Sequence, residues 1–193
     1  HQIDTVHWFT GLAHPRSVVA NGGVYQWKDG RRNWDTTTAV FDYGPTDDLS
    51  KGFQVVFMSR MHNGDDNASE VYYSVGGELN LINNKVSPKG GLIERFAKPM
   101  GMKPVLLPEM NLTEKVVKVE SGANTGGDPL TSAHVRNWME CIRSRKQTNA
   151  PVEAGYSHSI ATIMSNAAAR TGEKVTFDEK TQEVMAGGKI FKY

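Results

Sequence analysis

Two side chains at the start of the chain have types and spacing suited to acid–base chemistry. His1 and Asp4 stand three residues apart, and the apolar spacing of residues 2–12 predicts a short helix there. Residues three apart share one face of a helix, and a carboxylate beside an imidazole orients the ring and favours its protonated form. By spacing alone, a solvent-exposed surface pair is favoured over a catalytic pair.

The composition excludes several other classes of protein. The chain has 193 residues, a net charge of +1 and 38% hydrophobic residues. It has no apolar run long enough for a membrane span, and its charge gives no reason to expect nucleic acid or a membrane as partner. The single Cys141 excludes an internal disulfide and a cysteine-based zinc site, and we predict no metal ligands.

The elements that must position these side chains begin with antiparallel strands. Residues 17–20, 24–27 and 36–43 have strand patterns, and Lys28-Asp29-Gly30 has the composition of a tight turn between the last two. We therefore predict a hairpin that directly follows the first strand.

The next strand has an unusual pattern. Residues 53–61 are apolar on both faces, which indicates a central strand whose second face is covered by another domain or subunit. A hairpin with glycines at its turn is expected over residues 70–82, and a further strand near residues 115–119.

The C-terminal third is predicted to be helical. One helix contains Val135, Trp138, Met139 and Ile142 at helical spacing, and a second runs over residues 153–170. The order of helix, strands and helices predicts an α+β fold with an open, mostly antiparallel sheet and helices packed on one face. We expect all four tryptophans in the core or on the sheet.

Short motifs along nearly the whole chain occur in the order and spacing of one protein family. They are, in chain order, His1-x-x-Asp4-x-x-x-Trp8, Pro15-x-Ser17-Val18-x-Ala20-x-Gly22-Gly23-x-Tyr25, Asp35-Thr36, Phe41-Asp42-Tyr43, Val75-Gly76-Gly77-Glu78-Leu79, His134-Val135-Arg136-Asn137-Trp138, Pro151-Val152-Glu153-x-Gly155, Ala167-x-x-x-Thr171-Gly172 and Phe177-Asp178. In these motifs the chain resembles the C-terminal domain of the glucose-fructose oxidoreductase / inositol dehydrogenase (Gfo/Idh/MocA) family.

The resemblance implies a division of labour between two domains. In that family an N-terminal Rossmann domain binds NAD or NADP, and a C-terminal domain shapes the substrate pocket and oligomerises through its sheet. His1 matches the end of the family motif Asp-x-x-x-His, which implies that its imidazole helps to move the substrate hydroxyl proton during hydride transfer.

The Asp of that motif, the family's Glu-Lys-Pro lysine and its Gly-rich dinucleotide loop do not occur in this sequence. We therefore expect residues 1–193 to form a single substrate-binding and oligomerisation domain. We also expect that the dinucleotide-binding domain is missing from this chain, that the chain has no cofactor-binding residues, and that it is inactive when isolated.

The resemblance also implies further pocket residues. Asp4 matches a polar pocket residue, and Glu153 and His158 lie at an edge that borders the pocket in the family. Arg31 and Asp35 follow the predicted turn and could reach a polyol or a carboxylated sugar, although exposed hairpin charges fit these residues equally well.

The expected function is that of one part of a nicotinamide-dependent oxidoreductase acting on a sugar, a cyclitol or a related polyol. Two alternatives stay open: an NAD-dependent glycosidase of the same family, and a binding or assembly domain without catalysis. The expected partners are the sugar or polyol, the missing Rossmann domain, and further copies of the chain at the sheet face. The compartment is cytoplasmic by default, and a periplasmic or exported location stays open because no leader can be read before His1.

Overall fold

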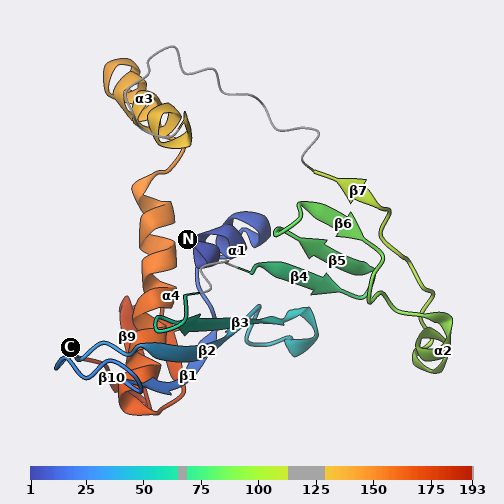
Figure 1. Cartoon of the computed structure of the whole chain (residues 1–193), viewed down its shortest axis with the longest axis horizontal. Coiled ribbons are helices and arrows are strands. Elements are labelled where there is room, and N and C mark those ends of the chain that lie inside the picture. The colour runs from blue at the N-terminus through green and yellow to red at the C-terminus, as the bar shows by residue number, and fades with distance from the viewer. Residues whose placement is uncertain (65–68, 113–128, 193) are drawn as a thin grey trace. The chain divides into compact units, whose positions relative to one another are not determined.

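The computed structural model describes residues 1–64, 69–112 and 129–192 (Figure 1). The chain forms two compact units. Unit 1 consists of His1–Asp65 and Ser144–Tyr193, and unit 2 is the segment that lies between them in the sequence. The single domain over residues 1–193 that the sequence predicts stays a prediction. The predicted strand at residues 115–119 lies outside the described residues.

Unit 1 is built on a six-stranded sheet in which every pair is antiparallel, in the order β10-β9-β8-β1-β2-β3. Its strands are β1 (Ser17–Gly23), β2 (Thr36–Tyr43), β3 (Phe53–Arg60), β8 (Val175–Asp178), β9 (Glu183–Ala186) and β10 (Lys189–Ile190). Its helices are α1 (Gln2–Thr10), the 3-10 turn η1 (Leu49–Lys51) and α4 (Val152–Thr171). The strands nearest the C-terminus thus join the sheet beside the first strand of the chain.

The core of unit 1 lies between this sheet and α4. The helix packs against β1, β2, β8, β9 and α1. Its buried side chains are Ile160, Ala161, Met164, Ala167 and Ala168, whose spacing places them on one face. Opposite them, β1, β8 and β2 contribute Val18, Val175 and Phe41, which are at most 2% exposed. The open antiparallel sheet with helices on one face confirms the predicted α+β class.

The position of β3 corrects one prediction. Residues 53–61 were expected to form a central strand, yet β3 is the edge strand and pairs with β2 alone. Its inward-facing residues are half-buried, whereas Val56 and Met58 on the other face are 62% and 67% exposed. Val19 on β1 and Val40 on β2 stand in register with Val56, so an apolar stripe crosses the outer face of the sheet.

The segment between β1 and β2 corrects another prediction. Residues 24–35 contain no strand, and β1 continues through Gly22 and Gly23 to pair directly with β2. Gly22 allows this continuation because a Cβ there would lie only 2.1 Å from the carbonyl oxygen of Thr36. The predicted strand at residues 24–27 is therefore wrong, and these residues belong to a loop.

Unit 2 contains a four-stranded antiparallel sheet in the order β4-β5-β6-β7. Its strands are β4 (Val71–Ser74), β5 (Gly77–Asn80), β6 (Lys85–Ser87) and β7 (Met110–Asn111), and its helices are α2 (Glu94–Ala97), the 3-10 turn η2 (Lys98–Met100) and α3 (Pro129–Ser144). The predicted hairpin over residues 70–82 is confirmed as β4 and β5, and the first predicted C-terminal helix as α3.

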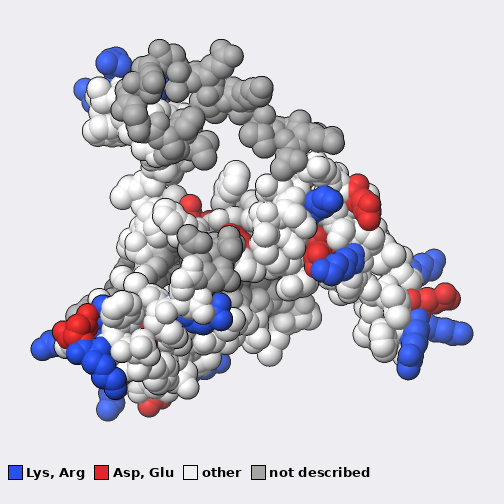
Figure 2. Space-filling view, in the orientation of Figure 1, with Lys and Arg blue, Asp and Glu red and all other residues white. Residues whose placement is uncertain are grey.

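Charged side chains of both signs are interspersed over the described surface. On the face drawn in Figure 2, Lys and Arg side chains stand beside Asp and Glu, with broad uncharged areas between them. This distribution agrees with the net charge of +1. No helix in the described ranges is long and apolar enough to cross a membrane.

Candidate functional site

Three of the predicted site residues meet where α1 lies beside α4. The imidazole of His158 on α4 donates from Nδ1 to Asp4 Oδ1 at 3.3 Å, across 154 positions of the chain. Both side chains are about half exposed, so the pair contributes little to stability and stays accessible to a ligand. Asp4 and His158 line a hollow of about 220 Å³. His1, the N-cap residue of α1, lines it too, together with Phe41 and Phe57 of the sheet.

The other predicted residues are not part of this hollow. Arg31 lies in the exposed loop before β2, where its guanidinium binds Asp29 at 2.6 Å and stacks over Trp27 at 4.9 Å from the ring centroid. Glu153 lies exposed in the first turn of α4, where a carboxylate complements the helix dipole. The structure thus places these two side chains in roles that need no ligand.

Asp35 has a structural role that its sequence position did not reveal. Its carboxylate is 1% exposed and accepts hydrogen bonds from the backbone N–H groups of Tyr25, Gln26 and Trp27, at 2.8–3.1 Å. The hydroxyl of Thr36 donates a fourth, at 3.0 Å. Burial acts to raise the pKa of Asp35, but these four donors outweigh it and hold the pKa well below its ordinary value. The side chain therefore fixes the loop that precedes it.

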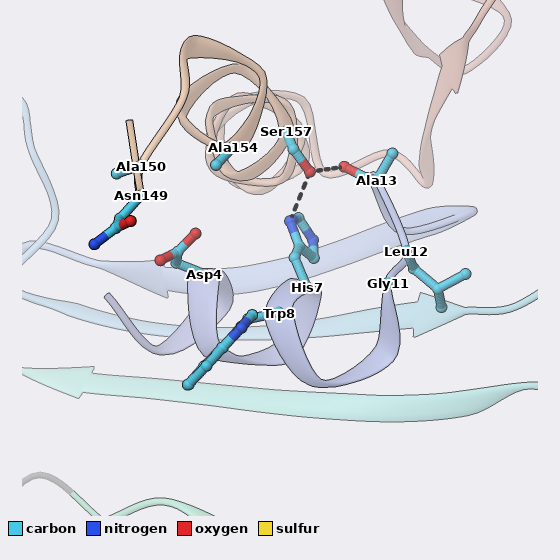
Figure 3. A pocket seen from close by; sticks show the side chains of 10 residues that line it. All are labelled: Asp4, His7, Trp8, Gly11, Leu12, Ala13, Asn149, Ala150, Ala154 and Ser157. Atoms are coloured by element: carbon cyan, nitrogen blue, oxygen red, sulfur yellow. Dashed lines mark hydrogen bonds between the residues drawn. The ribbon is translucent and has the colours of Figure 1, made fainter. Parts of the chain in front are cut away.

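A buried network beside the candidate pocket was missed by the sequence analysis. His7 on α1 is 7% exposed, and both of its ring nitrogens have partners. Nε2 lies 2.8 Å from the hydroxyl of Tyr43 on β2, and Nδ1 lies 3.0 Å from Ser157 Oγ on α4. Ser157 Oγ in turn bonds to the carbonyl oxygen of Ala13 (Figure 3). The network joins α1, β2, α4 and the segment after α1.

The carbonyl group of Ala13, at one end of this network, determines which atoms carry the hydrogens. A carbonyl oxygen only accepts, so the single hydroxyl hydrogen of Ser157 points to Ala13. His7 Nδ1 must then carry a hydrogen and donate to Ser157, which leaves Nε2 to accept from Tyr43. Because its hydroxyl hydrogen is committed to a carbonyl, Ser157 is not arranged as a nucleophile activated by His7.

The protonation states agree with this assignment. Burial lowers the pKa of His7 below its ordinary value of 6.5; the nearby Asp4 opposes this shift, and His158 and His14 add to it. Burial also raises the pKa of the Tyr43 hydroxyl. At neutral pH the network therefore consists of a neutral imidazole between two hydroxyl groups.

Asp4 also lines a second and larger hollow. It has a volume of about 430 Å³ and lies between the exposed side of α1 and the beginning of α4 (Figure 3). Trp8, expected in the core or on the sheet, lines this hollow and is 80% exposed, which corrects that expectation. Asp4 lines both hollows, so they are neighbours.

The described residues contain no group of three or more His, Cys, Asp or Glu side chains placed to hold a metal ion. Comparison of the chain with protein-family models, with curated proteins and with solved structures gave no match. The function must therefore be argued from the geometry of the two hollows.

Proposed function

We propose that the chain supplies the substrate pocket and the oligomer interface of a nicotinamide-dependent oxidoreductase that acts on a sugar, a cyclitol or a related polyol. The observation that carries the proposal is the convergence of His1, Asp4 and His158 on one hollow. His158, 154 positions after Asp4, joins the two residues at the start of α1, so the hollow combines an imidazole for proton transfer with a carboxylate and a second imidazole that can bind hydroxyl groups.

The proposal assigns different roles to the three side chains. His1, at the open start of α1, takes the proton of the reacting hydroxyl as hydride leaves the adjacent carbon. Asp4 and His158 hold neighbouring hydroxyl groups and orient the ring. A Rossmann domain outside residues 1–193 would hold NAD or NADP, which would supply the hydride acceptor.

Binding of polyols to the chain itself tests the pocket. Titration with myo-inositol and methyl β-D-glucopyranoside should shift the imidazole NMR signals of His1 and His158. Asp4→Asn should weaken binding, whereas Glu179→Gln should not. Glu179 is a matched control because it is also an exposed carboxylate paired with an imidazole, that of His14, at 3.0 Å. If neither polyol moves the His1 and His158 signals, the pocket is assigned wrongly.

Two measurements test the cofactor part of the proposal. Calorimetric titration of the chain with NADH and NADPH should give no tight binding, because the dinucleotide site is proposed to lie elsewhere. The coding sequence before His1 should contain a strand, a Gly-rich loop and a helix, and should end in Asp followed by three residues. Tight dinucleotide binding by residues 1–193 would contradict this part.

The outer face of the unit 1 sheet is the proposed interface between copies. Val19, Val56 and Met58 are 45%, 62% and 67% exposed on this face. Val56→Lys should lower the oligomeric state in analytical ultracentrifugation, and Val75→Lys, at a residue of unit 2 that is 65% exposed, should leave it unchanged. The same face favours a second candidate, an assembly domain without catalysis, which would replace the first if the chain oligomerises but binds no polyol.

A further inference from the structure

The larger hollow beside α1 has room for a ring because small residues form its walls. Gly11, Ala13, Ala150 and Ala154 line it, and a Cβ added at Gly11 would meet nothing within 4 Å. Its volume of about 430 Å³ lies in the range of small-molecule sites, roughly 300–1,000 Å³.

One wall of this hollow is an exposed aromatic ring. The indole of Trp8 is 80% exposed, and its ring contact is with Phe9, tilted by 36° at 5.5 Å between centroids. An indole offers a large flat apolar surface at low cost in conformational entropy, and stacking a ligand on it removes that surface from water. The C–H face of a sugar or cyclitol ring is a suitable partner.

Polar groups stand near the edge of that ring. Asp4 is one helical turn before Trp8, and in Figure 3 its carboxylate lies between the indole and the residues before α4, where Asn149 also lines the hollow. Among the described residues, the Asp4 side chain has one hydrogen-bond partner, His158, through Oδ1. A carboxylate accepts several hydrogen bonds, so capacity remains for ligand hydroxyl groups.

The charge of the hollow selects among ligands of this shape. Asp4 is the single charged side chain among the ten residues that line it in the described structure, and His7 is held neutral by burial. An anionic sugar, whether carboxylated or phosphorylated, would meet this carboxylate, and none of the ten lining side chains is a cation that could balance its charge. A neutral polyhydroxylated ring fits better.

We propose that the hollow between α1 and the start of α4 is a subsite for a neutral sugar or cyclitol ring, which stacks on Trp8 and donates hydroxyl hydrogen bonds to Asp4. The inference rests on the proposed function for its substrate class, and it adds Trp8 as the residue that selects a ring face. Because Asp4 borders both hollows, a ring held here presents one hydroxyl toward the side where His1 lies.

Fluorine NMR of the chain labelled with 5-fluorotryptophan tests this subsite. The signal of Trp8 is identified as the one that disappears from the spectrum of Trp8→Phe. Titration with myo-inositol or methyl β-D-glucopyranoside should shift the Trp8 signal to saturation and leave Trp27 unchanged. Glycerol, which has hydroxyls but no ring face, should produce no saturable shift. Trp8→Ala should weaken binding about tenfold, because the stacking surface is lost.

Matched variants separate the subsite from a general effect on folding. Ala154→Leu fills the hollow with a side chain that suits a helix, so it should abolish the shift without lowering the melting temperature. Trp27→Phe removes another exposed tryptophan of unit 1 and should leave binding intact. Undiminished binding in Trp8→Ala or in Ala154→Leu would overturn the subsite. If a polyol moves the His158 signal but not that of Trp8, the subsite fails and the proposed function stands. If it moves neither, both fail.

Discussion

Replacing Tyr43 with Phe removes one hydrogen bond from the core and changes little else. The ring of Tyr43 is fully buried, stacks on Phe53 at 5.2 Å with an interplanar angle of 6°, and meets the edge of His7 at 5.6 Å. Phe retains these ring contacts. The variant therefore isolates the hydroxyl group that donates to His7 Nε2 at 2.8 Å.

The expected loss of stability follows from what the hydroxyl leaves behind. In Tyr43→Phe the Nε2 atom of a buried imidazole keeps its lone pair and loses its donor. An unsatisfied buried polar group costs about 1–3 kcal/mol, more than the net value of a typical hydrogen bond between neutral groups. We expect the free energy of unfolding of unit 1 to fall by about 1–3 kcal/mol.

Native-state hydrogen exchange measures this change separately in each unit. The amides of Val40 and Phe41 on β2 should lose protection by the expected amount, whereas the amide of Leu79 in unit 2 serves as an internal reference. Tyr25→Phe, at a residue that is 63% exposed, is the matched control and should stay within about 0.5 kcal/mol of the wild type. If the free energy of unfolding of Tyr43→Phe also stays within about 0.5 kcal/mol of the wild type, the hydrogen bond between Tyr43 and His7 does not stabilise the core of unit 1.

Three further predictions concern other parts of the chain. Burial holds the pKa of His7 below 6.5, so as the pH falls below about 6.5 the unfolded chain binds a proton more readily than the folded chain. The free energy of unfolding should therefore drop by at most about 1.4 kcal/mol per pH unit. Urea titrations at pH 7.5, 6.5 and 5.5 measure this slope, and a flat profile would contradict it. Asp35→Asn keeps the size of the side chain but removes its charge and replaces an acceptor oxygen with NH₂. The backbone amide hydrogen of Trp27 should therefore exchange faster with solvent, while the amides of β2 stay protected. Unchanged exchange at Trp27 would show that Asp35 does not hold the loop between β1 and β2. At Gly77, with φ of 141°, a Cβ would lie 2.1 Å from the carbonyl oxygen of Ser87, so Gly77→Ala should unfold unit 2 at markedly lower urea concentration. Gly155→Ala is its control, since a Cβ there meets nothing within 4 Å, and it should be neutral or stabilising by up to about 1 kcal/mol in the helix.

The helices of unit 1 could be predicted because their signals are local. Apolar spacing identified α1 and α4, and glycines in the left-handed conformation end both: Gly11 has a φ of 69° and Gly172 a φ of 71°. The Asp4–His158 contact was not visible in such patterns. Both side chains were proposed for the pocket from the family resemblance, and their distance in space depends on how α4 packs against α1.

The errors occurred where distant residues decide the local structure. The order of strands in unit 1 depends on β8 joining β1, so the apolar pattern of residues 53–61 alone could not distinguish a central strand from an edge strand. The backbone N–H groups of residues 25–27 donate to the carboxylate of Asp35, which lies 8–10 positions later in the chain. The partners of His7 lie 36 and 150 positions away, and no sequence pattern connects them.

The split of unit 1 into two segments has a consequence for the order in which the protein is made. Val18 of β1 pairs with Val175 of β8, and the core also requires α4, so the first 65 residues cannot complete their fold while the ribosome is still translating the middle of the gene. During synthesis at about 5–20 residues per second, unit 2 emerges whole before the second segment of unit 1 does. Throughout that interval β1, β2 and β3 lack the cover of α4, so the apolar side chains that α4 buries in the finished fold are exposed to aggregation.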